Sequence, residues 1–228
     1  QLTWDNTASP SLDLGVTTAL IGNCGFTLAP CKPEHRDLNM LNLTKVEGMS
    51  YEALKEGIDW NYKTYNDYLN LLESKKLALN VCSYVGHSAL RRWSMGEAAM
   101  ERQAKECEIN IMEGIVKDAM QSGAIGFSTS TFEGHNGSGG RPMPSRLAAS
   151  TEITRLIKAM AYNGRGIFML TKSNNTTIKF SLGDKNNSLL CDFMDCEYKC
   201  KPNNNISNEN INKDSYSEKF IIMNLDKI

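Results

Sequence analysis

Hydrophobic positions along this chain fall into short apolar runs separated by longer segments with helical spacing. The short runs lie at residues 16–21, 77–85, 124–128 and 167–171 and predict buried strands, and the first of them is rich in β-branched residues. Apolar residues at three- and four-residue steps predict helices over residues 65–75, 89–95, 102–121 and 150–163, the last capped by Ser150. Strands alternating with helices indicate βαβ units and a parallel sheet.

Two architectures accommodate such strands within about 170 residues: a doubly wound sheet, or half of a (β/α)₈ barrel. A complete (β/α)₈ barrel typically needs about 250 residues. No glycine-rich nucleotide-binding motif follows any predicted strand, which disfavours the doubly wound sheet. Polar residues follow the first three strands, and the active sites of barrels collect at that edge. We therefore expect an α/β fold that is about the first half of a TIM-type barrel.

The composition of the chain changes near Lys172. Residues 172–228 contain 11 Asn, as many as residues 1–171 together, and they contain no Ala and no Arg. We therefore divide the chain into a partial barrel over residues 1–171 and an Asn/Lys-rich tail over residues 172–228. The tail is expected to be either a disordered appendage or not a native continuation of the barrel.

Charge and cysteine content narrow the class of protein. A formal net charge of −1 gives no general attraction to nucleic acid or acidic lipid, and no apolar run is long enough to span a bilayer. The 7 Cys residues, without a secretory leader, favour reduced thiols and a cytoplasmic location. We expect no nucleic-acid partner and no membrane association.

The segment GNCG, at residues 22–25, follows the first predicted strand directly. Its two glycines allow positive φ angles, which bring the side chain of Cys24 to the mouth of the strand. A thiol there can bind a metal or meet a substrate, whereas the structural alternative is a turn in which Cys24 packs as a small hydrophobic residue. The spacing alone leaves both interpretations open.

Other candidate groups follow the second and third strands. The chain has 3 His residues and no HxH or HExxH motif, so spacing reveals no complete metal site. His87 and Arg91, within GHSALR, are suited either to binding a substrate carboxylate or to capping a turn. The glycine-rich loop 134–146, with His135 and Arg146, is typical either of a mobile lid for an anionic substrate or of a solvated loop.

The third strand leads into the string GFSTS, which contains Ser128. A Ser nucleophile there would need a base, and no residue close in sequence supplies one. The GxSxG motif is also absent. Serine hydrolase chemistry is therefore discounted.

Four strings, in this order and at these separations, carry a family resemblance: QLTWDNTASPS, GVTTALIGNCGFTLAP, LNVCSYVGHSALR and SGAIGFSTS. Through them, residues 1–171 resemble the N-acyl-D-amino-acid deacylase (D-aminoacylase) branch of the amidohydrolase superfamily. GNCG together with GHSALR is fairly specific for that branch, whereas GFSTS alone is a weak signal.

The resemblance implies a (β/α)₈ barrel beside a small β-sandwich, with zinc at the strand ends and hydrolysis of the amide of N-acyl-D-amino acids. Cys24 matches the family's cysteine metal ligand, a thiolate suited to zinc. The GH…R motif and the segments that match substrate-facing loops supply the expected substrate-binding residues: His87, Arg91, Ser128, His135 and Arg146.

Departures from the family pattern define the expected function. The family's HxH pair lies before the segment that matches Gln1, and its later His ligands and catalytic Asp belong to strands that would follow Thr171. We therefore expect a fragment of a zinc-dependent hydrolase of N-acyl-D-amino acids, inactive alone and able to self-associate through open barrel edges. The alternative is a catalytically dead binding module for an anionic, acyl-amino-acid-like ligand.

Overall fold

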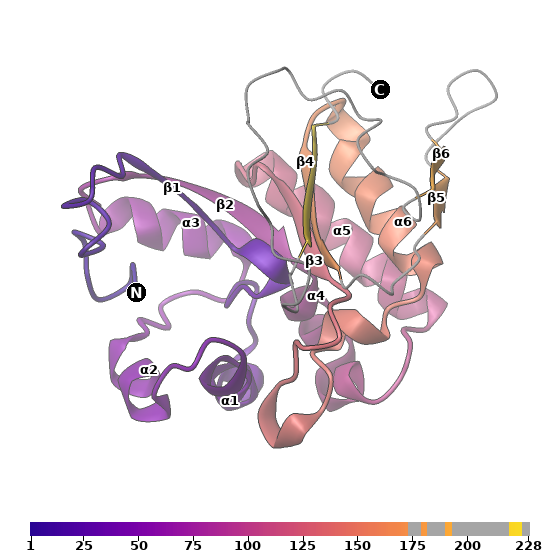
Figure 1. Cartoon of the computed structure of the whole chain (residues 1–228), viewed down its shortest axis with the longest axis horizontal. Helices are drawn as coiled ribbons and strands as arrows, with labels where there is room; N and C mark the ends of the chain where they lie inside the picture. The colour runs from indigo at the N-terminus through magenta and orange to yellow at the C-terminus, as the bar shows by residue number, and fades with distance from the viewer. Residues whose placement is uncertain (173–178, 182–189, 193–218, 225–228) are drawn as a thin grey trace, which may run out of the picture.

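A parallel sheet forms the centre of the fold. The computed structural model of this chain describes residues 1–172, 179–181, 190–192 and 219–224. Within them, neighbouring strands pair in parallel in the order of the chain: β1 (Thr18–Ile21), β2 (Asn80–Gly86), β3 (Gly126–Ser130) and β4 (Ile167–Lys172). Figure 1 shows helices packed along one face of these strands. The predicted α/β fold, a partial barrel of the TIM type, is confirmed for this part of the chain.

Helices connect each strand to the next. They are α1 (Arg36–Val46), α2 (Tyr51–Gly57), α3 (Tyr65–Ser74), α4 (His87–Met95), α5 (Glu106–Ser122) and α6 (Ser150–Met160). The sequence did not predict α1 and α2, which lie together beyond the end of the sheet (Figure 1). The buried positions of α1 include Asn39 and Asn42 beside Met40, so the helix lacks a clear apolar stripe.

The main hydrophobic core lies between the sheet and the helices. Val85, Phe127 and Phe168, from three neighbouring strands, pack in one cluster with Met112 of α5 and Leu156 of α6. All five side chains are 0% exposed, and the rings of Phe127 and Phe168 stack with centroids 6.0 Å apart. Burying side chains of this size contributes roughly 1.5–3 kcal/mol each, which holds the helices to one face of the sheet.

The helix ends follow the sequence signals in part. Gly123, with a φ of 113°, ends α5, as its position after the last apolar residue predicts. The prediction that Ser150 caps α6 is wrong: Ser150 is the first helical residue, and Ala149 occupies the N-cap position without a side-chain hydrogen bond. Contacts of Glu152, described below, hold the start of α6 in place of a cap.

A strand from the tail pairs with the outer edge of β4. This strand, β7 (Lys219–Asn224), runs antiparallel to β4 along the whole length of both strands. Two short strands, β5 (Lys179–Ser181) and β6 (Leu190–Asp192), pair with each other. The expected disorder or non-native origin of the tail concerns residues that mostly lie outside those described, so it stays a prediction.

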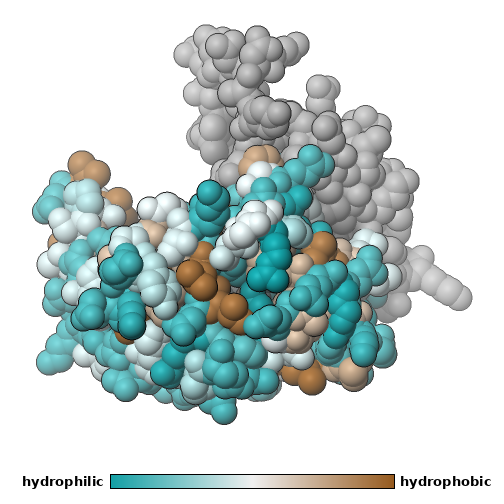
Figure 2. Space-filling model, turned by 90° about the horizontal axis from the view of Figure 1, so that it is seen from below, coloured by the Kyte–Doolittle hydropathy of each residue, from teal (hydrophilic) through white to brown (hydrophobic). Residues whose placement is uncertain are grey.

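The C-terminal ends of the parallel strands point toward α1, α2 and the loop that follows β3, at the bottom of Figure 1. Figure 2 views the molecule from that side, and the visible surface is mostly hydrophilic with small hydrophobic areas. Among the described residues, no helix is both long enough and apolar enough to cross a membrane.

Deletion of residues 219–228 is expected to promote self-association, because it exposes the unpaired backbone N–H and C=O groups of β4. Deletion of residues 225–228 alone retains β7 and is the matched control. Sedimentation velocity at several concentrations should show larger species for the first variant only. If both variants sediment alike, β7 does not protect this edge.

Candidate functional site

The turn after β1 places Cys24 at the C-terminal end of that strand. Gly22 and Gly25 have φ angles of 83° and 76°, which confirms the predicted use of positive φ, and Cys24 itself has a φ of 59°. A Cβ atom at Gly22 would lie 3.0 Å from the carbonyl oxygen of Tyr84, and one at Gly25 would lie 3.0 Å from that of Ser128. Only glycine permits this close approach of the turn to β2 and β3.

Hydrogen bonds from two strands fix this turn. The Ser128 hydroxyl, from β3, donates to the carbonyl oxygen of Gly22. The Thr171 hydroxyl, from β4, donates to the sulfur of Cys24 at 3.2 Å. Because β1 and β4 are not neighbours in the sheet, this last contact requires the sheet to curve as it does in a barrel.

Successive side chains of β3 point to opposite faces of the sheet, and this separates the predicted site residues into two groups. Ser128 and Ser130 point away from the helices, to the side where Ser128 meets the turn of Cys24. Phe127 and Thr129 point toward the helices, where Phe127 is part of the core and Thr129 bonds to His87.

The loop after β3 folds back so that His135 meets Ser130. The Nδ1 atom of His135 lies 2.7 Å from Oγ of Ser130, and the His135 ring packs edge-on against Phe26 and Phe132. The inference that no base lies near the serines of GFSTS is therefore wrong, because the loop brings the base to Ser130. Ser130 is 0% exposed, however, which keeps its hydroxyl from solvent.

Arg146 is bound to the loop that carries His135. Its Nη1 donates to the carbonyl oxygen of His135 at 3.2 Å and to the side-chain oxygen of Asn136. The guanidinium is half-buried, and burial lowers its pKa, although the charge of Glu133 acts in the opposite direction. These bonds give the loop a defined shape around His135.

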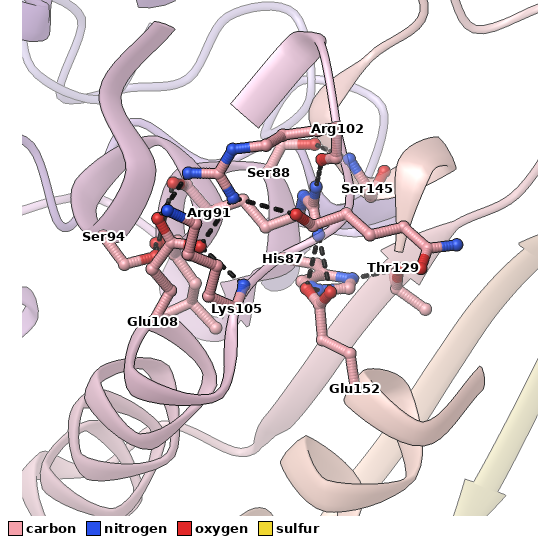
Figure 3. Close-up of polar contacts among 12 residues, drawn as sticks. His87, Ser88, Arg91, Ser94, Arg102, Lys105, Glu108, Thr129, Ser145 and Glu152 are labelled. Atoms are coloured by element: carbon pink, nitrogen blue, oxygen red, sulfur yellow. Dashed lines mark hydrogen bonds and ion pairs between the residues drawn. The ribbon is translucent and has the colours of Figure 1, made fainter. Parts of the chain in front are cut away.

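On the helical side of the sheet, His87 and Arg91 converge on Glu152 (Figure 3). The Nε2 atom of His87 lies 2.8 Å from Oε1 of Glu152, and its Nδ1 lies 2.7 Å from Oγ1 of Thr129. Nη1 of Arg91 lies 2.7 and 2.6 Å from the two carboxylate oxygens of Glu152, and Nη2 donates to the carbonyl oxygen of Arg102. The network joins α4, β3 and α6.

The protonation states in this network follow from its geometry. Burial lowers the pKa of His87, although its hydrogen bond to Glu152 acts in the opposite direction. Burial acts to raise the pKa of Glu152, but the hydrogen bonds from His87 and Arg91 and the positive charge of Arg91 outweigh it and lower that pKa. Glu152 is therefore ionised, Arg91 is its counter-ion, and His87 is neutral, donating from Nε2 and accepting from Thr129 at Nδ1.

Hydroxyl, imidazole and carboxylate stand here in the order found in hydrolase triads. Thr129, His87 and Glu152 are all 0% exposed, however, so no substrate reaches the hydroxyl from solvent. What the arrangement does is hold three elements together. The roles of His87 and Arg91 in substrate binding stay a prediction, and the contacts described here are internal to the protein.

The described residues do not supply a complete metal site. No three His, Cys, Asp or Glu side chains within them gather so that they could hold a metal ion, whereas a zinc site uses three or four protein ligands. Cys24 offers one half-buried sulfur at the strand end. The other cysteine of this segment, Cys31, is buried, and burial raises its pKa to about 11, so its thiol stays protonated.

Comparison with known proteins shows which proteins this chain is similar to. The D-aminoacylase of Alcaligenes xylosoxydans xylosoxydans is 31% identical over 160 residues, which are 70% of this chain and 28% of that protein. A solved structure of a D-aminoacylase, described as defining a novel subset of amidohydrolases, matches with a TM-score of 0.51 and 31% identity, over 70% of this chain and 29% of that one. The chain is homologous to the D-aminoacylases.

Other D-aminoacylase relatives agree with this assignment. The N-acyl-D-aspartate deacylase of the same organism is 31% identical over 125 residues, 54% of this chain and 22% of that protein. A D-aminoacylase structure that addresses its binuclear metal center matches with a TM-score of 0.51 and 30% identity, over 70% of this chain and 29% of that one. No family model matches the chain. The chain thus spans less than a third of the length of these D-aminoacylase relatives.

The residues that sequence reasoning missed are Glu152, Thr129, Ser130 and Thr171. Glu152 and Thr171 lie on a predicted helix and a predicted strand, and Thr129 and Ser130 directly follow the predicted third strand. The sequence shows that these residues are polar, but it does not show their partners. An acid in the first turn of a helix is ordinarily explained by the helix dipole. Only the packing of α6 against α4 shows that Glu152 is a buried counter-ion.

Replacing Glu152 with Gln is expected to destabilise the fold by about 3–5 kcal/mol, because the change leaves the charge of Arg91 buried without a partner. Glu106 is exposed and pairs with Arg155, so Glu106→Gln is the control. Its expected loss in the free energy of unfolding is about 0–1 kcal/mol. Urea unfolding measures both changes. Equal, small effects would show that the buried pair does not hold α4 to α6.

The free energy of unfolding is expected to fall as the pH drops below about 6.5, the ordinary pKa of His. Because the pKa of His87 is lowered in the folded state, the unfolded chain takes up the proton first, so stability is full above this pH and is lost below it. One such group gives a slope of at most about 1.4 kcal/mol per pH unit.

His35, whose pKa is also lowered by burial, titrates over the same range, so the measurement needs two variants. The slope that remains in His35→Gln should disappear when His87→Gln is added. A slope that survives both changes would place the titration on another group.

Proposed function

We propose that this chain is part of a zinc-dependent amidohydrolase of N-acyl-D-amino acids and that, alone, it does not turn over substrate. Homology over 160 residues to a D-aminoacylase is the observation that carries the proposal. The rim at the C-terminal ends of the parallel strands, where barrel enzymes hold their active sites, contributes the turn of Cys24. In this proposal residues 1–171 form the barrel portion, and residues 172–228 form a tail whose strand β7 pairs with the edge of the sheet.

Cys24 is the proposed metal ligand of this chain. Its sulfur lies at the end of β1, is half-buried, and accepts a hydrogen bond from Thr171, as a thiolate ligand held by a neighbouring group would. The remaining ligands would have to come from outside the described residues, because one sulfur does not bind zinc tightly.

Small N-acyl amino acids are the proposed ligands, with His135 and Arg146 as the groups that face them. Both lie on the loop after β3, at the same end of the sheet as Cys24, and Arg146 brings a positive charge suited to a carboxylate. Ser128 holds the turn of Cys24 in place, because its hydroxyl donates a hydrogen bond to the carbonyl oxygen of Gly22. His87 and Arg91 stay predicted substrate-binding residues, and their bonds to Glu152 hold α4 to α6.

Purified chain incubated with zinc and N-acetyl-D-methionine is expected to release no methionine above the uncatalysed rate, because the residues that the structure describes do not supply a complete set of metal ligands. An authentic D-aminoacylase assayed in parallel shows that the conditions support turnover. Clear release of methionine by this chain would overturn the proposed inactivity.

Metal binding tests the role of Cys24 separately from activity. Titration with Co²⁺ should give a weak thiolate-to-metal absorption band that is lost in Cys24→Ser. Cys107→Ser, at an exposed cysteine of α5, is the matched control and should leave the band unchanged. A band that survives Cys24→Ser would assign the ligand to another cysteine.

A further inference from the structure

Two adjacent arginines of α4 are buried, and the described part of the chain provides a carboxylate partner for Arg91 but not for Arg92. Arg91 is 0% exposed and binds both oxygens of Glu152, whereas Arg92 is 1% exposed and binds no acid among the described residues. Nη1 of Arg92 donates to the carbonyl oxygen of Gly96 at 3.0 Å, and Nη2 to the sulfur of Met100 at 2.8 Å. Its Nε has no hydrogen-bond partner in the described part of the chain.

This environment satisfies the guanidinium of Arg92 poorly. A thioether is a weak acceptor, and a buried charge without a counter-ion is costly. Burial lowers the pKa of Arg92, and the positive charge of Arg141 lowers it further, while Glu97 and Cys31 act in the opposite direction. Of the charges that act on the pKa of the buried Arg92, that of a second cation, Arg141, has the largest effect.

His35 contributes a third basic group to the same place. Its Nε2 lies 3.5 Å from the position of a Cβ on Gly96, the residue whose carbonyl oxygen binds Arg92. Its Nδ1 is buried and has no partner among the described residues. Burial lowers the pKa of His35, and the charges of Lys32 and Arg92 act in the same direction, against Glu34 and Glu97.

The glycine-rich loop holds Arg141 beside this group. The Ser138 backbone N–H donates to Oδ1 of Asn42 in α1, and Nδ2 of Asn42 contacts the same Met100 sulfur that Arg92 uses. The loop closes on itself through the Gly137 backbone N–H, which donates to the carbonyl oxygen of Arg141 at 2.7 Å. These hydrogen bonds hold the loop so that its exposed residue Arg141 lies near the buried Arg92 of α4.

We propose that Arg92, Arg141 and His35 form a binding site for a small oxyanion, a carboxylate or a phosphate group. The planar guanidinium matches either group with two parallel hydrogen bonds, and the unpartnered nitrogens of Arg92 and His35 supply further donors. Arg141 is exposed, so the ion enters beside it and completes the charge balance of Arg92. The site is independent of the proposed hydrolase function, since neither Cys24 nor turnover is needed for it.

Titration of the full chain with sodium phosphate and, separately, sodium acetate tests this proposal, at constant ionic strength set with chloride. One of the two anions is expected to raise the midpoint of thermal unfolding to a plateau and to shift the Nε–Hε resonance of Arg92 in NMR spectra. Tighter binding of acetate assigns a carboxylate ligand, and tighter binding of phosphate assigns a phosphate ligand.

Arg141→Gln should weaken the apparent affinity about tenfold, because it removes one charge-assisted hydrogen bond. Arg165→Gln removes an exposed charge elsewhere and should change the affinity less than twofold. If both variants weaken the apparent affinity for the anion equally, the effect reflects only the overall charge of the protein, and the proposed site is overturned. Absence of any saturable effect of either anion would also overturn it.

Arg92→Met provides a second, opposite readout. Without oxyanion this variant should be as stable as the wild type or more so, because it removes a buried charge for which the described residues offer no counter-ion. With saturating oxyanion the wild type should become the more stable of the two. If the order of stability of the two proteins is the same with and without the anion, the proposal fails. If Arg92→Met does not fold, the affinity of Arg141→Gln decides the test.

Discussion

A single ionised carboxylate, that of Glu152, connects two helices and a strand of this half of a barrel: α4, α6 and β3. It lies in the first turn of α6 and receives hydrogen bonds from His87 and Arg91 of α4, while His87 continues the chain of contacts to Thr129 on β3. Apolar side chains hold the same helices to the sheet, but they do so without direction. The carboxylate fixes how α4 and α6 are placed relative to each other, and the glycine turn of Cys24 then packs against a fixed β3.

The alternation of side chains along β3 decides what each polar residue can do. Thr129 faces the helices and joins a closed network, whereas Ser128 and Ser130 face the turn of Cys24 and the loop of His135. Residues that are adjacent in sequence thus serve two separate purposes. A run of polar residues after a strand is therefore evidence for a rim, but not for one site shared by all of them.

The sequence was most informative where one physical signal dominates. The apolar runs predicted β2, β3 and β4 closely, and the glycines at positions 22, 25 and 123 predicted positive φ angles that the structure has. The sequence was least informative where long-range contacts dominate. Asn42 and Asn39 make α1 look polar although they are buried, and the partners of Glu152 and Ser130 lie on other elements. The expected ligand role of Cys24 rests on family resemblance, because no periodicity encodes it.

The strand β7 occupies the edge of the sheet at which a further barrel strand would pair. Every strand of a TIM-type barrel runs in the same direction, so the next barrel strand would have to lie parallel to β4. The position is taken by a strand of opposite direction that belongs to the same chain. Any complementing half must compete with a covalently tethered segment, whose effective concentration is that of an intramolecular reaction. Assembly of a complete barrel from two pieces is thus a displacement reaction rather than a simple association.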